Sequence, residues 1–289
     1  DFILNKKESD YFHGLFKNWR LSATAVTDFI NIVDFNYQEF IQRHILKVPS
    51  QTNKFLIFGS LVHGVIEDLF SVKYDFNIYD EKIIVEFLET RLLKLPVFKE
   101  EKEDMIKKAL MLFPRLFQFF ANQNYKNPLV ESFLSPKLPV DDNFINLIGA
   151  IDLLDIDKNS NTLKIVDFKT GKAIEDLDTL KGNENKKLKA FRYKIQLHFY
   201  VLLINLWYGK SFASLQKSAS LIFIEAKNID LMEVKLDFDP QFYEMLKNVI
   251  VNIHKIVSNN QSIDTSKYDQ NFNGIQDFFI DLSSSDFKF

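Results

Sequence analysis

Three charged residues stand in a stretch that otherwise has the composition of buried β-structure. Asp152 lies within one apolar run, and Asp167 and Lys169 flank Phe168 in the next. Burying a charge costs free energy unless the charge is paired or holds a metal ion. Two carboxylates with a lysine beside them would form a site for a divalent cation, because carboxylate oxygens are hard ligands.

The elements that must position these residues are two strands joined by a tight turn. The apolar runs cover residues 148–154 and 163–168, and Asp157-Lys158-Asn159-Ser160-Asn161 between them is rich in turn formers. The pattern predicts a hairpin, which would bring the two carboxylates together from neighbouring strands.

The hairpin also carries a recognisable motif. Gly149-Ala150-Ile151-Asp152, followed by Ile165-Val166-Asp167-Phe168-Lys169-Thr170-Gly171, resembles the core motif of the PD-(D/E)XK nuclease superfamily. More narrowly, it resembles the RecB-like branch of that superfamily.

Two further segments extend the resemblance in the expected order. In residues 58–67, Gly59 and Ser60 predict a helix start, and the spacing of His63 and Glu67 resembles the first RecB-like motif, whose histidine reaches the metal. Glu67 is predicted to be structural. In a helix predicted over residues 190–207, Gln196 and Tyr200 share a face and resemble the last motif, whose polar pair lies near DNA and the catalytic lysine; His198 is not expected to be a ligand.

The resemblance implies a nuclease site that uses Mg²⁺ or Mn²⁺ and hydrolyses phosphodiester bonds. Lys169 would orient or help deprotonate the attacking water, and the polar pair of the last motif would position Lys169 or the DNA. The metal ligands implied are His63, Asp152, Asp167 and the backbone carbonyl of Phe168. Glu131 has two interpretations, a further acidic residue near the metal or an ordinary exposed strand residue.

A basic run follows the hairpin; it begins in residues 175–189, which are predicted to be a polar loop, and continues into the predicted helix. Beside a metal site it would suit a phosphate backbone, while the alternative is a solvated loop. Its candidate DNA-binding residues are Lys186, Lys187, Lys189, Arg192 and Lys194.

The fold class implied is α/β, with a restriction-endonuclease-like core in which helices flank a mixed central sheet. We expect a single domain over residues 1–289, with a mainly helical part at 1–125, the catalytic core at 126–258 and a tail at 259–289. Further helices are predicted from Ser22 or Thr24, within 80–125 and from Asp239-Pro240. The first of them would bury Val33, and further strands are predicted near 129–134, 219–225 and 232–238.

Composition excludes several alternatives. The chain has no cysteine, which rules out disulfides, thiolate zinc sites, a cysteine nucleophile and the iron–sulfur cluster that several RecB-like nucleases carry. A net charge of −3 argues against a broadly basic DNA-binding domain, so contacts with DNA must come from local patches. No apolar run is long enough to span a membrane, and we expect a cytoplasmic protein.

Together these patterns predict a metal-dependent deoxyribonuclease that processes DNA ends, of exonuclease type, in recombination or repair. The chain begins at Asp1 rather than Met, so we expect a piece of a longer helicase–nuclease of UvrD/RecB or AddAB type. The alternatives are a catalytically silent module that binds DNA or a partner protein, and a hydrolase of small phosphates. The complete set of expected residues argues against the first, and the basic run against the second.

Overall fold

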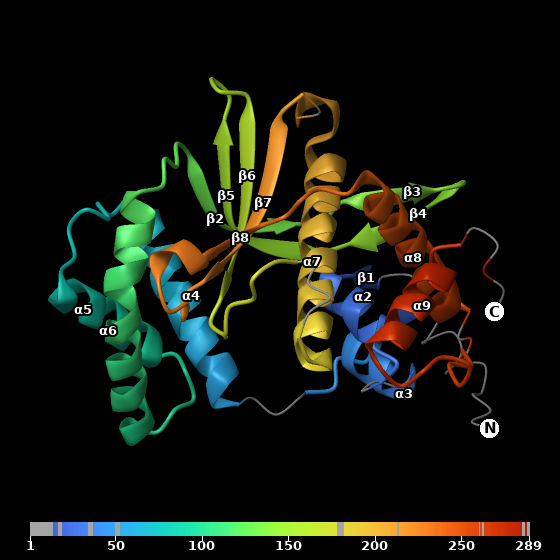
Figure 1. Ribbon diagram of the computed structural model, residues 1–289, viewed down its shortest axis with the longest axis horizontal. Helices are drawn as coiled ribbons and strands as arrows, with labels where there is room; N and C mark the ends of the chain where they lie inside the picture. The colour runs from blue at the N-terminus through green and yellow to red at the C-terminus, as the bar shows by residue number, and fades with distance from the viewer. Residues whose placement is uncertain are drawn as a thin grey trace.

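The centre of the fold is a mixed five-stranded sheet in the order β2-β5-β6-β7-β8 (Figure 1). The computed structural model describes residues 14–16, 19–33, 37–49, 53–177, 182–212, 214–259, 261, 263–284 and 287. The strands are β2 (Pro128–Leu134), β5 (Gly149–Asp157), β6 (Thr162–Lys169), β7 (Gln216–Phe223) and β8 (Glu233–Lys235). Strands β6 and β7 are parallel and the other pairs antiparallel, which confirms the predicted mixed sheet.

A second sheet of three short strands was not predicted. It has the order β1-β4-β3, with β1 at Arg20–Leu21, β3 at Lys137–Val140 and β4 at Asn143–Leu147. Pro139 lies inside β3, and a proline within a short apolar run argues against a strand when read from sequence. The structure accommodates it because β3 is an edge strand, where a missing N–H breaks no ladder.

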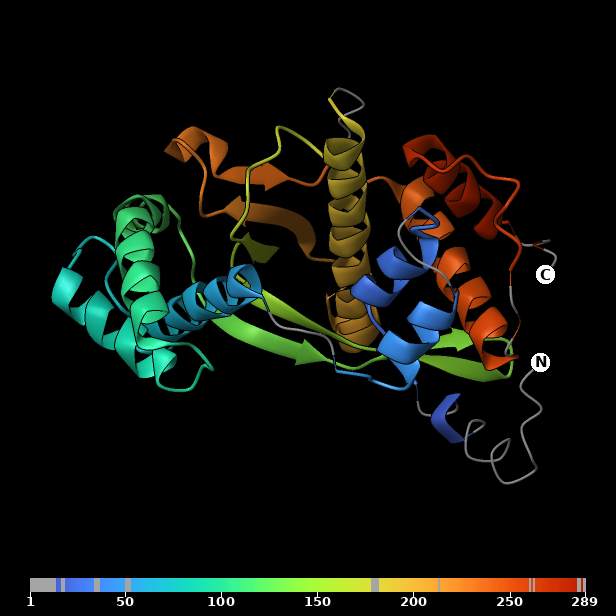
Figure 2. The same cartoon turned by 90° about the horizontal axis from the view of Figure 1, so that it is seen from below.

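Helices gather at the two ends of the five-stranded sheet (Figures 1 and 2). At one end lie α4 (Lys54–Ser71), α5 (Glu81–Leu92) and α6 (Lys99–Ala121). At the other lie α2 (Ala23–Ile30), α8 (Pro240–Ser258) and α9 (Phe272–Leu282), and α7 (Glu184–Tyr208) runs between them and the sheet. Shorter helical segments are α3 (Tyr37–Phe40), a π-helix at Ile41–Ile45, and 3-10 turns at Gly209–Phe212 and Ile229–Leu231. The fold class predicted from sequence is therefore confirmed.

Side-chain caps decide where the helices begin, and they correct two predictions. The Asn53 side chain accepts from the N–H of Leu56, so α4 begins at Lys54 and the predicted start at Gly59 is wrong. Asn183 caps α7 in the same way, so residues 184–189 are helical and not part of a loop. Ser22 and Asp239 cap α2 and α8 as predicted. Val33, predicted to be buried, is exposed beyond the end of α2.

Two glycines of the sequence motifs serve close packing. A Cβ on Gly149 would lie 2.5 Å from Leu203 Cδ1 of α7, so a side chain here would force the end of Leu203 to shift. A Cβ on Gly59 of α4 would lie 3.0 Å from Thr170 Oγ1, just past the end of β6. Both glycines thus leave room for a side chain that packs between a helix and the hairpin.

The segment after α8 packs onto the body of the fold. The buried Asn252 donates from Nδ2 to the carbonyl of Leu282 at 2.8 Å, and the Phe278 ring stacks on Phe29 of α2 with 6.3 Å between centroids. In the described residues, no helix is both long and apolar enough to cross a membrane.

A buried ion pair secures the N-terminal helices. Asp28 Oδ2 lies 2.9 Å from His44 Nε2 and 3.1 Å from Arg43 Nη1. Burial works to raise the pKa of Asp28, but the bonds and charges of these two partners outweigh it and lower that pKa. A carboxyl whose pKa is lowered on folding stabilises the protein above its unfolded pKa, near 4, and loses that contribution as pH falls through the folded pKa.

We therefore expect Asp28→Asn to lower the free energy of unfolding by roughly 1–2 kcal/mol at pH 7. The difference from the wild type should begin to shrink below about pH 4, where the unfolded-state carboxyl is protonated first, and should vanish once pH has fallen through the lower pKa of the folded state. Urea unfolding at pH 7 and pH 3 measures both values, with Asp142→Asn at an exposed turn as the control. An equal difference at the two pH values would contradict this account.

Candidate active site

Strand register lines up three carboxylates across one face of the sheet. Leu153 pairs with Val166, so Asp152 on β5 stands opposite Asp167 on β6. On the other side, Val130 pairs with Leu153 and Ser132 with Ile151, which places Glu131 on β2 opposite Asp152. Residues opposite one another on neighbouring strands point to the same face. Glu131, Asp152 and Asp167 therefore form a row that runs across three strands.

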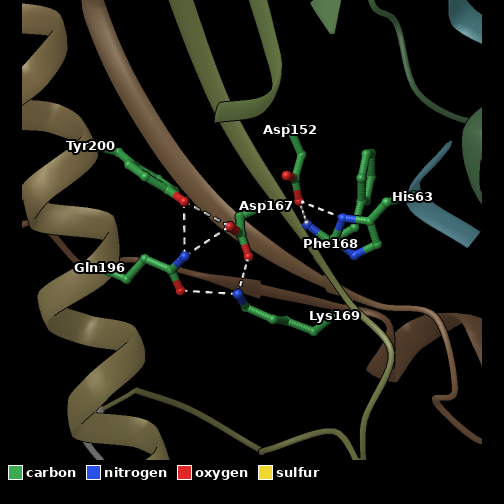
Figure 3. A network of polar contacts seen from close by, with 7 residues as sticks. All are labelled: His63, Asp152, Asp167, Phe168, Lys169, Gln196 and Tyr200. Atoms are coloured by element: carbon green, nitrogen blue, oxygen red, sulfur yellow. Dashed lines mark hydrogen bonds and ion pairs between the residues drawn. The ribbon is translucent and has the colours of Figure 1, made fainter. Parts of the chain in front are cut away.

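Asp167 is almost fully buried at the centre of a polar network (Figure 3). Its Oδ1 accepts from Gln196 Nε2 at 3.0 Å and from the Tyr200 hydroxyl at 3.1 Å. Its Oδ2 lies 2.5 Å from Lys169 Nζ, which also donates to Gln196 Oε1 at 3.0 Å. The structure thus brings together the aspartate and lysine of β6 and the polar pair of α7.

Burial and pairing act on this network in opposite directions. Burial raises the pKa of Asp167, against the attraction of Lys169, which lowers it. Burial also works to lower the pKa of Lys169, but the adjacent Asp167 charge outweighs it and raises that pKa. The pKa of Tyr200 is raised well above its usual range, first by burial and then by the nearby carboxylates. Lys169 is therefore an ammonium and Tyr200 a neutral hydroxyl donor at neutral pH.

His63, Glu131 and Asp152 form a second group beside this network. His63 Nδ1 lies 3.4 Å from Asp152 Oδ2, which also accepts from the N–H of Phe168 at 2.6 Å (Figure 3). One ligand atom from each of the three residues lies within 4.8 Å of the others. A histidine nitrogen and carboxylate oxygens suit Mn²⁺ or Mg²⁺. Within the described residues, this group therefore fits a divalent cation.

The charges of this group perturb one another. Burial works to lower the pKa of His63, but the hydrogen bond and charge of Asp152 raise it overall. The pKa of Glu131 is raised, first by burial and then by the Asp152 carboxylate. Two acids and a histidine that share so small a volume favour either protonation or a bound cation.

Glu131 adopts a backbone conformation that is rare for its residue type. Its φ is +47° in the middle of β2, a left-handed conformation that costs a non-glycine residue of order 1–3 kcal/mol. The strain coincides with the position opposite Asp152. Of the two interpretations open from sequence, the geometry favours a carboxylate at the metal site.

The three residues that the structure groups as possible metal ligands are not the same as the predicted ligand set. Asp167 is turned toward Lys169 and α7, whereas Glu131 joins His63 and Asp152. The contact shown for Phe168 is its N–H on Asp152, and a ligand role for its carbonyl stays a prediction. The only sequence signal for Glu131 was an acid within an apolar strand, because its pairing with Asp152 depends on register.

Two other motif residues have structural roles. Glu67 Oε2 accepts from Arg91 Nη2 at 2.9 Å, and the same guanidinium binds Asp68, which ties α4 to α5 as expected for a structural glutamate. His198 is fully buried; its Nδ1 lies 2.8 Å from the Lys194 carbonyl, and its Nε2 accepts from the N–H of Asp239. It links α7 to α8 and does not line the site.

The basic run is spread around α7 rather than gathered on one face. Lys189 lies nearest the site: its Nζ donates to the Lys172 carbonyl and, like that of Lys169, lies over the Tyr193 ring. Lys194 packs over Phe242 of α8, and Lys187 pairs with Glu184. Lys186 is exposed near the start of the helix, and Arg192 is half-buried. Of this run, Lys189 is the residue that shares an aromatic ring with Lys169, and a DNA-binding role for it stays a prediction.

A mixed sheet that presents carboxylates and a lysine between a histidine-bearing helix and a glutamine-bearing helix is the arrangement of a restriction-endonuclease-like nuclease. The sequence model of the PD-(D/E)XK nuclease superfamily matches residues 35–269. The chain belongs to this superfamily.

Two solved structures match the chain at low sequence identity, and the first of them shares its fold. One is a protein of Eubacterium rectale described as a "putative exonuclease", which is 10% identical, with a TM-score of 0.53 over 91% of this chain and 89% of that one. Another is SSO0001, 13% identical with a TM-score of 0.27 over 75% of this chain and 86% of that one. No curated protein matches the chain significantly in sequence.

The position of Glu131 generates a test that does not depend on catalysis. A carboxyl whose pKa is raised on folding destabilises the protein above its unfolded pKa, and the penalty is relieved as pH falls through the folded pKa. We expect Glu131→Gln to raise the melting temperature of the metal-free protein at pH 7 by about 2–4 °C. This gain should disappear near pH 4.

The same variant should bind Mn²⁺ at least about tenfold more weakly, because a ligand has been lost. Differential scanning fluorimetry and calorimetric titration give the two readouts, with Glu86→Gln on the exposed face of α5 as the control. Unchanged Mn²⁺ affinity in Glu131→Gln would place this carboxylate outside the metal set.

Proposed function

We propose that the chain is a metal-dependent deoxyribonuclease that hydrolyses phosphodiester bonds at DNA ends. The observation that carries this proposal is the adjacency of two groups, the Lys169–Asp167 pair and the cation-binding set of His63, Glu131 and Asp152. One group supplies a positive hydrogen-bond donor and the other a place for a divalent ion, and phosphodiester hydrolysis needs both.

The residues present fit Mg²⁺ or Mn²⁺, held by His63, Asp152 and Glu131, with Asp167 beside them. Such an ion would polarise a phosphoryl oxygen and neutralise charge on the scissile phosphate. The proton of His63 and the ion compete for the same nitrogen, so acidic pH should weaken metal binding.

In this proposal Lys169 supplies a positive charge and an oriented hydrogen-bond donor. Because its pKa is raised, it stays protonated at neutral pH and does not act as the resting base. Held by Asp167 and Gln196, its ammonium would donate to the attacking water or to a phosphate oxygen and stabilise charge that develops in the transition state.

Gln196 and Tyr200 act through these residues and are positioning residues. Gln196 donates to Asp167 and accepts from Lys169, so one amide fixes both partners of the ion pair. Tyr200 donates to Asp167 and accepts from Gln196, which sets the orientation of the amide. Lys189 would add a contact to the DNA backbone near Lys169.

The finer assignments rest on the order of the motifs. His63, Asp152, Asp167 with Lys169, and Gln196 with Tyr200 follow one another as in RecB-like nucleases, which supports that branch, exonuclease-type end processing and a helicase partner. The alternative of a silent binding module would predict a broken site, whereas each of these side chains lies within the two groups described above.

We expect Lys169→Ala to lower the rate of Mg²⁺-dependent cleavage of end-labelled linear DNA by at least about 100-fold, because it removes a charge aimed at the transition state. Lys158→Ala, at the exposed turn of the same hairpin, is the matched control and should cleave normally. EDTA should abolish cleavage by the wild type. Circular dichroism verifies folding, since the substitution leaves Asp167 without its cation. A folded Lys169→Ala that cleaves at the wild-type rate would refute the assignment.

A further inference from the structure

One cavity of the described residues lies beside the proposed active site rather than in it. It has a volume of about 500 Å³ and opens where the C-terminal ends of α4 and α6 meet the start of β2. We call it the aromatic cleft. Tyr74, Phe76 and Tyr125 line it and are only partly buried, and the buried rings of Phe70 and Phe120 form part of its wall.

Two elements lead from the metal-binding set to the aromatic cleft. On α4, Phe70 follows His63 by seven residues, which returns to the same helix face about 10 Å further along the axis. On β2, Leu129 precedes Glu131 by two residues, about 7 Å along the strand. Helix α4 and strand β2 both reach the cleft, so the cleft adjoins the site.

The wall of the cleft is also in contact with the site. The Phe120 ring packs edge-to-face on Phe168 at 5.8 Å, and Phe168 packs edge-to-face on His63 at 6.0 Å. Within the wall, Phe76 lies 4.9 Å from both Phe70 and Phe120. These contacts hold the rings in place, so a flat ligand would enter a preformed space.

The charge of the aromatic cleft suits an anionic ligand. Lys73 and Lys126 lie exposed at its rim, and none of the described residues that line it is acidic. The chain as a whole carries a net charge of −3, so the positive charge at the rim of the cleft is a local feature. Aromatic faces with flanking lysines match the two parts of a nucleotide, the base that stacks and the phosphate that pairs.

We propose that the aromatic cleft binds a base of a single DNA strand whose scissile phosphate lies at the metal-binding set. The inference rests on the proposed function and adds a substrate class to it. The separation of about 10 Å corresponds to about three base steps of B-form DNA, and to fewer in an extended strand. A base can enter the cleft only after leaving its duplex, so the substrate is a single-stranded end, bound with little sequence preference.

The test measures binding without cleavage, in Mg²⁺, with Lys169→Ala as the background. Fluorescence anisotropy follows short single-stranded oligonucleotides in which one abasic site is moved along the strand. We expect one or two positions at which loss of the base weakens binding by roughly 5- to 100-fold, the range for one stacked base. Other positions should show little change.

A second substitution tests whether the loss of affinity at an abasic position arises in the aromatic cleft. Tyr125→Leu keeps an apolar side chain but removes the stacking face, so the intact and abasic strands should then bind alike at the sensitive position. Tyr125→Phe keeps the ring and should keep the penalty. Lys73 has a φ of +54°, which asparagine tolerates, so Lys73→Asn should weaken all strands equally and lower the salt dependence.

An abasic penalty that is uniform along the strand, or unchanged in Tyr125→Leu, would overturn the proposal. Lys73→Asn and Tyr125→Phe supply folded comparisons if Tyr125→Leu loses its structure. Cleavage of DNA by the unsubstituted chain distinguishes failure of the cleft assignment from failure of the proposed nuclease function. If it cleaves but shows no position-specific penalty, only the cleft assignment fails. If it neither cleaves nor binds single strands, the proposed nuclease function fails with it.

Discussion

The site depends on one buried ion pair, Lys169 with Asp167. Such a pair adds little to stability, since taking two charges out of water costs about as much as their attraction returns, and removing one partner leaves the other buried without compensation. The ion pair matters because it holds the side chains of the site in a fixed arrangement. Gln196 bonds to both partners and Tyr200 to the aspartate, so the lysine is held in one place and in one protonation state. A fixed, protonated amine beside a cation site is what phosphodiester chemistry needs.

Two helices must approach the hairpin closely for this arrangement to exist. Gly149 lets α7 reach the sheet, and Gly59 lets α4 come down on the end of β6. The helices then deliver the glutamine–tyrosine pair from one side and His63 from the other (Figure 3). Glycines inside regular elements weaken them, and here the missing side chains leave room for Leu203 and Thr170.

The same elements join the proposed chemistry to the proposed substrate site. Helix α4 carries His63 and continues to Phe70, and β2 carries the strained Glu131 and begins at the aromatic cleft. A strand of DNA laid along this face would meet aromatic rings and lysines before it meets the carboxylates. Lys73 and Lys126 would supply local positive charge to the proposed anionic substrate in a chain whose net charge is −3.

The sequence alone determined the hairpin and most helices, because alternation, turn formers and caps act over a few residues. The mixed sheet followed from the resemblance of the motifs to a known superfamily. The sequence patterns misplaced the start of α4 and the loop before α7, where Asn53 and Asn183 act as caps, and they missed the edge strand with Pro139. Only the tertiary structure decided that Glu131 stands opposite Asp152, that Asp167 turns toward α7, and that aromatic residues from α4, from α6 and from the segments that follow these two helices enclose a cleft. These features depend on strand register and helix packing between distant segments, and no local pattern encodes them.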